Sequence, residues 1–289
     1  MKKTTLIHSA WTEPMHSRWH VSNQIQGNLW LFALSVHYAK SVGADIILHT
    51  DSAGEKIFGV LPYDNIHITL DKLDLHCRFW AAGKMVAHEN SPLGYIHIDG
   101  DVFIKTTQAL EAITLKNEDV VFQSREYICF DSKYESTFYK YNLDLLRRHV
   151  DNDTMRLIKQ YESRDNAYNT GVFGFGNENL KREFLGGYWD TANKLCRNQS
   201  FIDEVNAYQD TCPDIILEQM HLYCLCRKHN AKTKSVFQEH DNIFEKAKEI
   251  GYTHIIGKEK YSHIDEVKAR LRELNPQLYS KVSDHIKTI

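Results

Sequence analysis

Residues 94–104 read GYIHIDGDVFI, in which two carboxylates follow the mainly apolar run at 94–98. Residues 94–98 have the pattern of a strand, and residues i and i+2 of an extended segment point the same way, so Asp99 and Asp101 face one side. Gly100 between them lets the backbone turn and a ligand approach closely. Two adjacent carboxylates repel each other unless a cation lies between them. Because oxygen ligands suit Mg²⁺ or Mn²⁺, the stretch predicts a divalent metal site, shared with phosphates, at a strand end.

The same spacing has a second interpretation, a polar turn. The chain contains another D-x-D, Asp151-Asn152-Asp153, which follows a segment with the pattern of a helix end. A cap or turn between two helices explains that second pair fully. Since only Asp99 and Asp101 follow a strand, we expect metal binding at the first pair and not at the second.

Strand-like and helix-like segments alternate along the rest of the chain. Strands are predicted at 4–8, 44–49, 66–70, 119–123, 170–175 and 232–237, and helices at 28–40, 78–88, 137–149, 154–162, 180–195, 213–229 and from 262 onward. The run ADIILH at 44–49 is apolar almost throughout, which is typical of a strand covered on both faces. The alternation predicts an α/β fold with a mainly parallel sheet flanked by helices, as one domain over residues 1–289. In such sheets ligands bind beyond the carboxyl ends of the strands.

Composition excludes several classes of protein. The chain has 35 Lys+Arg against 38 Asp+Glu, a net charge of -3, which argues against a generic nucleic-acid binder. No apolar run approaches the ~18 residues of a membrane span, and the first residues lack the apolar stretch of a secretory signal, so we expect a soluble, cytoplasmic protein. The C-x-C of Cys224 and Cys226 has no second close pair to complete a zinc site, which favours buried free thiols.

A second motif lies near the C-terminus. Residues 251–260 read GYTHIIGKEK and contain H-x-x-G-x-x-K at His254, Gly257 and Lys260. A neutral imidazole is a good ligand for Mn²⁺, a glycine lets a backbone N–H approach a phosphate, and a lysine supplies a charge for it. Taken alone, a turn with solvated lysines explains the segment equally well.

In this order, and about 150 residues apart, the two motifs resemble those of GT-A glycosyltransferases. The first is similar to the metal-binding D-x-D, and the second to the H-x-x-G-x-x-K of the glycogenin-like, retaining branch. Residues 169–174 (NTGVFG) resemble the segment that lines the sugar site in that family. Glu218-Gln219 resembles the family's Asp-Gln pair, with Glu in place of Asp. The Pro-Trp that usually follows the lysine is replaced by Tyr261-Ser262.

The resemblance implies a GT-A-like fold with a nucleotide-binding half at about 1–105, a donor-sugar and acceptor half at about 106–260, and C-terminal helices at 261–289. It implies that Asp99, Asp101 and His254 hold Mn²⁺ or Mg²⁺. The residues that it assigns to the nucleotide are Thr50, Asp51, Arg78, Lys84, Gly257 and Lys260. The residues that it assigns to the donor sugar and the reaction are Asn169, Glu218 and Gln219.

The implied activity is transfer of a sugar from a nucleotide-diphosphate donor, by default a UDP-sugar, to a glycan, a lipid-linked glycan or a small molecule. The C-terminal motif favours retention of configuration. Inversion needs a carboxylate base, and the sequence does not choose among its candidates, which are Asp165, Asp210, Asp214 and Glu218. Trp11, just after the first strand, either stacks on a base or sugar or belongs to the core.

Three other classes of protein compete with this interpretation. A haloacid-dehalogenase-type phosphatase also has D-x-D, but near its N-terminus and with Thr or Val where Phe103 stands. A nucleotidyltransferase of similar topology has a Gly-rich loop after the first strand, whereas residues 9–14 read SAWTEP. A GT-A-like protein that binds nucleotides or glycans without catalysis stays open, because intact metal ligands do not prove turnover.

Overall fold

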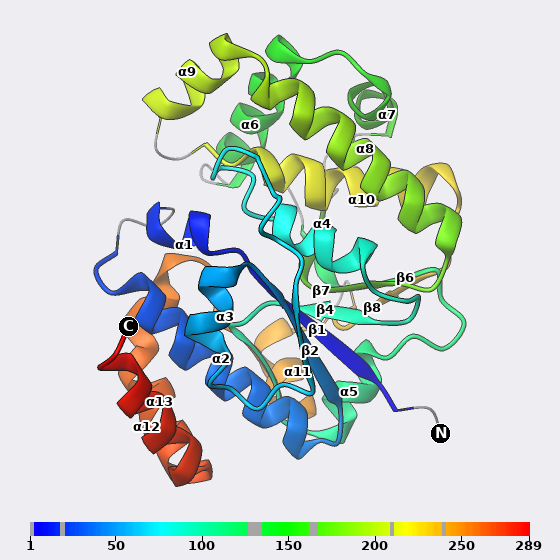
Figure 1. Ribbon diagram of the computed structural model, residues 1–289. Helices are drawn as coiled ribbons and strands as arrows, with labels where there is room; N and C mark the ends of the chain where they lie inside the picture. The colour runs from blue at the N-terminus through cyan, green and yellow to red at the C-terminus, as the bar shows by residue number, and fades with distance from the viewer. Residues whose placement is uncertain (1–2, 18–20, 127–134, 162–166, 209–210, 239–240) are drawn as a thin grey trace.

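The computed structural model describes residues 3–17, 21–126, 135–161, 167–208, 211–238 and 241–289. A seven-stranded sheet in the order β3-β2-β1-β4-β7-β6-β8 lies at its centre (Figure 1). The strands are β1 (Thr5–Ala10), β2 (Asp45–Thr50), β3 (Asn65–Ile68), β4 (Ile96–Ile98), β6 (Val120–Glu126), β7 (Ala167–Phe175) and β8 (Thr233–Ser235). Every neighbouring pair is parallel except those of β7, which runs antiparallel to β4 and β6. The predicted α/β class with a mainly parallel sheet is confirmed.

Helices cover both faces of this sheet (Figure 1). One apolar core packs under α4 (Ala82–Glu89), α6 (Glu135–His149), α7 (Asp153–Tyr161), α8 (Glu178–Cys196), α9 (Gln199–Ala207) and α10 (His221–Lys228). The other packs under α2 (Gln24–Ser41), α3 (Ser52–Phe58), α5 (Thr107–Ile113), α11 (Ile243–Ile250), α12 (Ile264–Leu274) and α13 (Pro276–Ile286). Residues 46–50 of β2 are all buried, as expected of a strand between two helical layers. Among the described residues, no helix has the length and apolar composition needed to cross a bilayer.

Several element boundaries differ from the predictions. The helix expected at 78–88 begins at Ala82, and the one expected at 213–229 begins with a π-helical turn, η1 (Ile215–Met220), that continues into α10. The C-terminal helix is divided at Asn275, whose side chain accepts the backbone N–H of Leu278 and so begins a second helix. The last residue predicted for the helix at 154–162 lies outside the described residues.

The order of the strands creates a crevice between β1 and β4. From β1 the chain builds outward through β2 and β3, and it then returns to the opposite side of β1 as β4. Where the strand order reverses in this way, the connections leave in opposite directions and open a crevice beyond the carboxyl ends of the strands. Asp99 follows β4 directly, and α1 (Thr12–Ser17) follows β1 across the crevice. The sheet therefore places the predicted metal site where α/β folds bind ligands.

Candidate functional site

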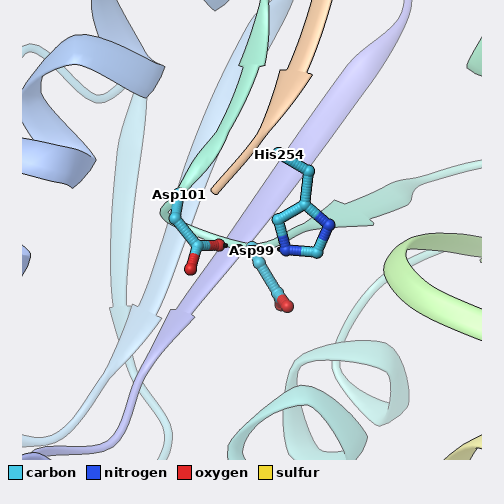
Figure 2. Close-up of side chains that lie close together, drawn as sticks. All are labelled: Asp99, Asp101 and His254. Atoms are coloured by element: carbon cyan, nitrogen blue, oxygen red, sulfur yellow. Dashed lines mark ion pairs between the residues drawn. The ribbon is translucent and has the colours of Figure 1, made fainter. Parts of the chain in front are cut away.

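A second, two-stranded sheet brings the two sequence motifs together. The antiparallel strands β5 (Val102–Ile104) and β9 (Tyr252–His254) pair Val102 with His254, and the backbone N–H of Ile255 donates to the carbonyl of Asp101 over 3.1 Å. As a result the ligand atoms of Asp99, Asp101 and His254 all lie within 4.8 Å of one another (Figure 2). The structure thus brings His254 to Asp99 and Asp101, which lie about 150 residues before it in the sequence.

The chemistry of these three side chains fits a divalent cation. Oδ1 of Asp101 is buried and has no hydrogen-bond donor among the described residues. Nε2 of His254 lies 3.4 Å from that oxygen. A buried oxygen without a donor is costly, and a cation between the groups would satisfy it. Two carboxylates and an imidazole are a donor set that suits Mn²⁺, with Mg²⁺ as the ion preferred by the oxygens alone.

Lys260 adds positive charge at the edge of this cluster. Its Nζ lies 2.9 Å from Oδ2 of Asp101, and the lysine side chain is 16% exposed. Burial raises the pKa of the Asp101 carboxyl, but the Lys260 ammonium beside it outweighs that effect and holds the pKa below its usual range. Asp101 is therefore ionised at neutral pH, as a metal ligand must be.

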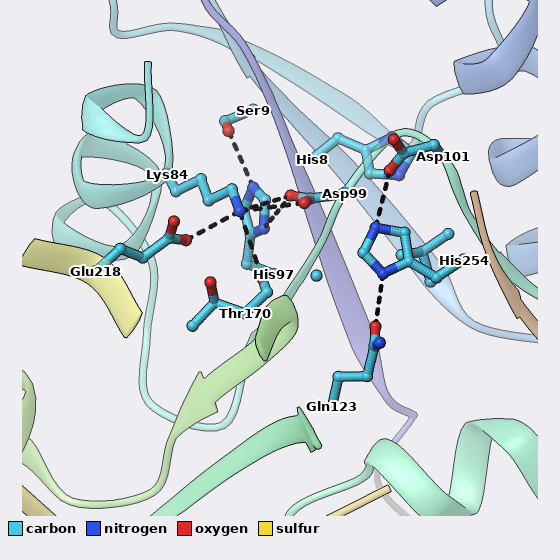
Figure 3. A network of polar contacts seen from close by, with 12 residues as sticks. His8, Ser9, Lys84, His97, Asp99, Asp101, Gln123, Thr170, Glu218 and His254 are labelled. Atoms are coloured by element: carbon cyan, nitrogen blue, oxygen red, sulfur yellow. Dashed lines mark hydrogen bonds and ion pairs between the residues drawn. The ribbon is translucent and has the colours of Figure 1, made fainter. Parts of the chain in front are cut away.

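Lys84 lies on the other side of the cluster, in a buried ion triad (Figure 3). Its Nζ lies 2.8 Å from Asp99 and 2.9 Å from Glu218, and it also donates to the carbonyl of Thr170 over 3.3 Å. Burial lowers the pKa of Lys84, but the two carboxylates outweigh it and raise that pKa. The sequence predicted phosphate binding for Lys84, whereas here its charge is directed at Asp99 and Glu218.

Lys84→Met is expected to destabilise the fold by about 3–5 kcal/mol, because it leaves the Glu218 carboxylate buried without a cation. Urea unfolding of wild type and variant measures this loss. Adding Glu218→Gln to the same chain removes the uncompensated charge and should recover most of the stability. A loss below about 1 kcal/mol in the single variant would contradict the triad.

The cluster lies in a cleft of about 1150 Å³. Nine of the twelve site residues predicted from the sequence line it, namely Arg78, Lys84, Asp99, Asp101, Asn169, Gln219, His254, Gly257 and Lys260. Trp11 lines the cleft as well, although it is only 7% exposed, so it belongs to both the core and the wall. The cleft extends from α1 and α2 past the cluster to Trp80 and Tyr139.

The other three predicted residues do not line the cleft, and each has a structural role. Thr50 donates to the carbonyl of Ala10 over 2.7 Å. Asp51 caps α3 through Gly54 and also accepts from Thr12, so its oxygens hold two segments together. Glu218 is fully buried beneath the cleft wall, where it holds Lys84. The nucleotide and sugar roles predicted for the three residues remain predictions.

Two of the four carboxylates predicted as alternative bases lie among the described residues, and both are buried. Asp214 accepts from the backbone of Ala81 and from the Tyr188 hydroxyl, at 2.7 Å each, and is fully buried. Glu218 is held by Lys84. Asp165 and Asp210 lie outside the described residues.

Sequence reasoning missed Glu126, a carboxylate on the cleft wall at the end of β6. It accepts from Asn169 Nδ2 over 2.6 Å and from the Tyr139 hydroxyl over 3.0 Å. The Tyr139 hydroxyl also lies 2.6 Å from Gln219 Oε1, so the two predicted sugar-site residues are linked through Glu126 and Tyr139. Because β6 runs parallel to β4, the carboxylate at its end lies at the same edge of the sheet as Asp99, an arrangement that only the folded sheet reveals.

The second D-x-D has the structure of a helix start. Asp153 is the first residue of α7, and its exposed carboxylate pairs with Arg156 at 2.7 Å, while Asp151 pairs with the same arginine at 3.0 Å. Asn152 caps the helix by accepting from the N–H of Met155. The interpretation of this pair as a cap is confirmed.

Gly171 on β7 provides the space that His254 occupies. The pairing of β6 with β7 is irregular at this point, and the Gly171 carbonyl accepts the N–H of Asp99 over 2.8 Å. A Cβ at Gly171 would lie 2.3 Å from Cε1 and 2.6 Å from Nδ1 of the His254 ring. Irregular pairing beside functional sites commonly changes the direction of side chains. Here the absence of a Cβ at Gly171 leaves room for the His254 ring.

Gly171→Ala is expected to displace His254, to lower Mn²⁺ affinity at least tenfold and to destabilise the fold by about 1–3 kcal/mol. Calorimetric titration with Mn²⁺ and thermal unfolding measure the two effects. Gly186→Ala is the matched control, because a Cβ there meets nothing within 4 Å and alanine favours the helix. Unchanged Mn²⁺ affinity in Gly171→Ala would argue against His254 as a ligand.

Fold and site together define an α/β protein with a candidate divalent-cation cluster in a cleft at the carboxyl ends of its strands. A profile described as "Family of unknown function (DUF6734)" matches residues 4–285, and the chain belongs to this family. A search of curated proteins gives no match.

Three solved structures resemble the chain at low sequence identity. The galactosyltransferase LgtC, solved with donor and acceptor sugar analogs, is 9% identical with a TM-score of 0.45, over 94% of this chain and 100% of LgtC. The inositol-1-phosphate CTP transferase from T. maritima is 12% identical with a TM-score of 0.45, over 92% of this chain and 96% of the other. The glycosyltransferase GlyE of Streptococcus pneumoniae TIGR4 is 11% identical with a TM-score of 0.42, over 100% of this chain and 64% of GlyE.

Proposed function

We propose that this protein is a metal-dependent glycosyltransferase that moves a sugar from a nucleotide-diphosphate donor to an acceptor. The observation that carries the proposal is the cluster of Asp99, Asp101 and His254, with Lys260 beside it, in a cleft at the reversal point of the strand order. A UDP-sugar is the donor to test first, and a glycan, a lipid-linked glycan or a small molecule is the acceptor. The resemblance of the two motifs to the retaining branch leads us to expect retention.

In this proposal two carboxylates and a histidine of the cleft bind the cation, and its basic residues bind the phosphates. Asp99, Asp101 and His254 would hold Mn²⁺ or Mg²⁺, and the bound cation supplies charge neutralisation for a diphosphate leaving group. Lys260 can turn from Asp101 toward the phosphates, and the backbone at Gly257 lies open to the cleft. Arg78 is another cation on the cleft wall. These positive charges would stabilise the negative charge that develops as the donor bond breaks.

The donor sugar would bind against the polar wall built from Asn169, Gln219, Tyr139 and Glu126. The Asn169 amide donates to Glu126 over 2.6 Å, and the Tyr139 hydroxyl lies 3.0 Å from Glu126 and 2.6 Å from Gln219 Oε1 and can donate to one of them. These contacts orient the four side chains before a ligand enters. Preorganised polar groups of this kind position hydroxyl groups without a cost in reorganisation. Glu218 acts indirectly in this account, because it holds Lys84 and so the orientation of Asp99.

The proposal is tested by incubating the protein with UDP-, GDP- and CDP-sugars in Mn²⁺ and following free sugar and nucleotide by NMR. A transferase hydrolyses its donor slowly when no acceptor is present. We expect one donor to be cleaved, EDTA to stop the reaction, and the anomer released first to report retention or inversion. Tight metal-dependent binding without cleavage of any donor would instead indicate a binding protein.

A further inference from the structure

Gln123 is buried behind the metal cluster, although no sequence motif includes it. It lies on β6 and is 4% exposed. Its Oε1 lies 2.7 Å from Nδ1 of His254 (Figure 3). The same oxygen lies 2.6 Å from the hydroxyl oxygen of Tyr252, which is itself buried on β9. One amide oxygen therefore contacts the ring of a candidate ligand and a second side chain of the same strand.

These contacts favour one position for the proton on a neutral His254 ring. An amide oxygen only accepts hydrogen bonds, so Nδ1 of His254 and the hydroxyl of Tyr252 are both donors to Gln123. A neutral imidazole has one donor nitrogen and one acceptor nitrogen. With the proton on Nδ1, Nε2 carries the lone pair, and it is Nε2 that faces Oδ1 of Asp101 at 3.4 Å.

Without a cation, this tautomer is energetically unfavourable, and a purely structural role for His254 would not require it. Two acceptors, Nε2 of His254 and Oδ1 of Asp101, face each other, and the carboxylate oxygen has no hydrogen-bond donor among the described residues. If Nε2 carried the proton, it would donate to Asp101 and satisfy that oxygen. Gln123 favours the opposite tautomer, which leaves both lone pairs directed at the place where a cation would lie.

We propose that Gln123 is a positioning residue that fixes the Nδ1-protonated tautomer of His254 and so presents Nε2 to the cation. Tyr252 holds the amide oxygen in place from the other side. Gly171 leaves the space that this contact needs, since a Cβ there would lie 2.9 Å from Oε1 of Gln123 and 2.6 Å from Nδ1 of His254. The proposal rests on the cation site of the proposed function and not on sugar transfer itself.

The first test measures the affinity of the nucleotide-free protein for Mn²⁺, by the EPR signal of the free ion. Gln123→Leu should weaken binding by about 10–100-fold, the effect typical of losing the partner that orients a metal-ligating histidine. Gln123→Glu keeps an acceptor in the same place and should stay within about threefold of wild type or bind more tightly. Tyr252→Phe should lie between the two variants. Gln108→Leu, at an exposed position of α5, is the matched control and should not change the affinity.

The second test needs no metal and no activity. Long-range ¹H–¹⁵N NMR of the metal-free protein assigns the protonated nitrogen of His254. We expect Nδ1 in wild type and in Gln123→Glu, with a shift toward Nε2 in Gln123→Leu. A wild-type His254 protonated on Nε2, or Mn²⁺ affinity that Gln123→Leu leaves unchanged, would overturn the proposal. Wild type that binds no Mn²⁺ would contradict the proposed function, and the tautomer alone would then decide the role of Gln123.

Discussion

Asp101→Asn is expected to abolish metal-dependent nucleotide binding and to lower any sugar transfer or donor hydrolysis by about 10³-fold. The asparagine has the shape of aspartate but no charge, so the cation loses an anionic ligand. The oxygen that we expect to bind the cation is the buried Oδ1 of Asp101, which has no hydrogen-bond donor among the described residues. Lys260 would lose its carboxylate partner at 2.9 Å in the same variant.

The other D-x-D supplies the control for this prediction. Asp153→Asn makes the same chemical change in an exposed pair with Arg156, where we expect no effect on nucleotide binding. Donor hydrolysis and UDP binding are measured for both variants with Mn²⁺ present. Activity retained in Asp101→Asn within tenfold of wild type would contradict the assignment of Asp101, provided that its thermal unfolding is unchanged.

A second large effect is expected from acid. Five histidines that are at most 2% exposed have lowered pKa values because burial disfavours the charged imidazolium. Burial lowers the pKa to about 3 for His8 and to about 4 for His49 and His221, and to well below the usual value for His88 and His97. Since the unfolded chain binds these protons near pH 6.5, stability is full above that pH and falls as the pH drops through it.

Between pH 7 and pH 5.5 each of these histidines should remove about 1.3 kcal/mol, or about 6 kcal/mol in total. That is much of the ~5–15 kcal/mol by which a typical domain is stable. His76 acts in the opposite direction, because hydrogen bonding to Cys77 raises its pKa, but it is one group against five.

Urea unfolding at several pH values tests this expectation, with the free energy of unfolding as the readout. His221→Gln should reduce the pH dependence near pH 5.5 by nearly one proton, about 1.2 kcal/mol per pH unit. Stability that changes by less than about 1 kcal/mol between pH 7 and pH 5.5 would show that the buried histidines bind protons in the folded state.

The sequence predicted those parts of the site in which a recognisable motif directly follows a predicted strand. Asp99 and Asp101 follow an apolar run, and the structure places them beside His254. The α/β class followed from the alternation of periodic segments, and it is confirmed. The antiparallel direction of β7 was not predicted, because an apolar strand buried on both faces carries no local sign of its direction.

Other residues could not be assigned without the tertiary structure. Asp51 at the end of a strand can bind a ligand or cap a helix, and its bond to Gly54 shows the cap only in the folded chain. The sequence offers Lys84 as a cation for phosphates, and its ion pair with Glu218 becomes visible only in the folded chain. Gln123 and Glu126 belong to no motif, and their importance comes from contacts with side chains far away in the sequence, among them His254 and Asn169.

The most direct test of the metal and nucleotide site is calorimetric titration of UDP into the wild-type protein, first with Mn²⁺ and then with EDTA. The account predicts a Kd on the order of micromolar with Mn²⁺ and binding at least about 100-fold weaker without it, a difference of ~2.7 kcal/mol. Equal affinity in EDTA would contradict a cation at Asp99, Asp101 and His254. Absence of binding by UDP, GDP and CDP alike with Mn²⁺ present would contradict the donor site itself.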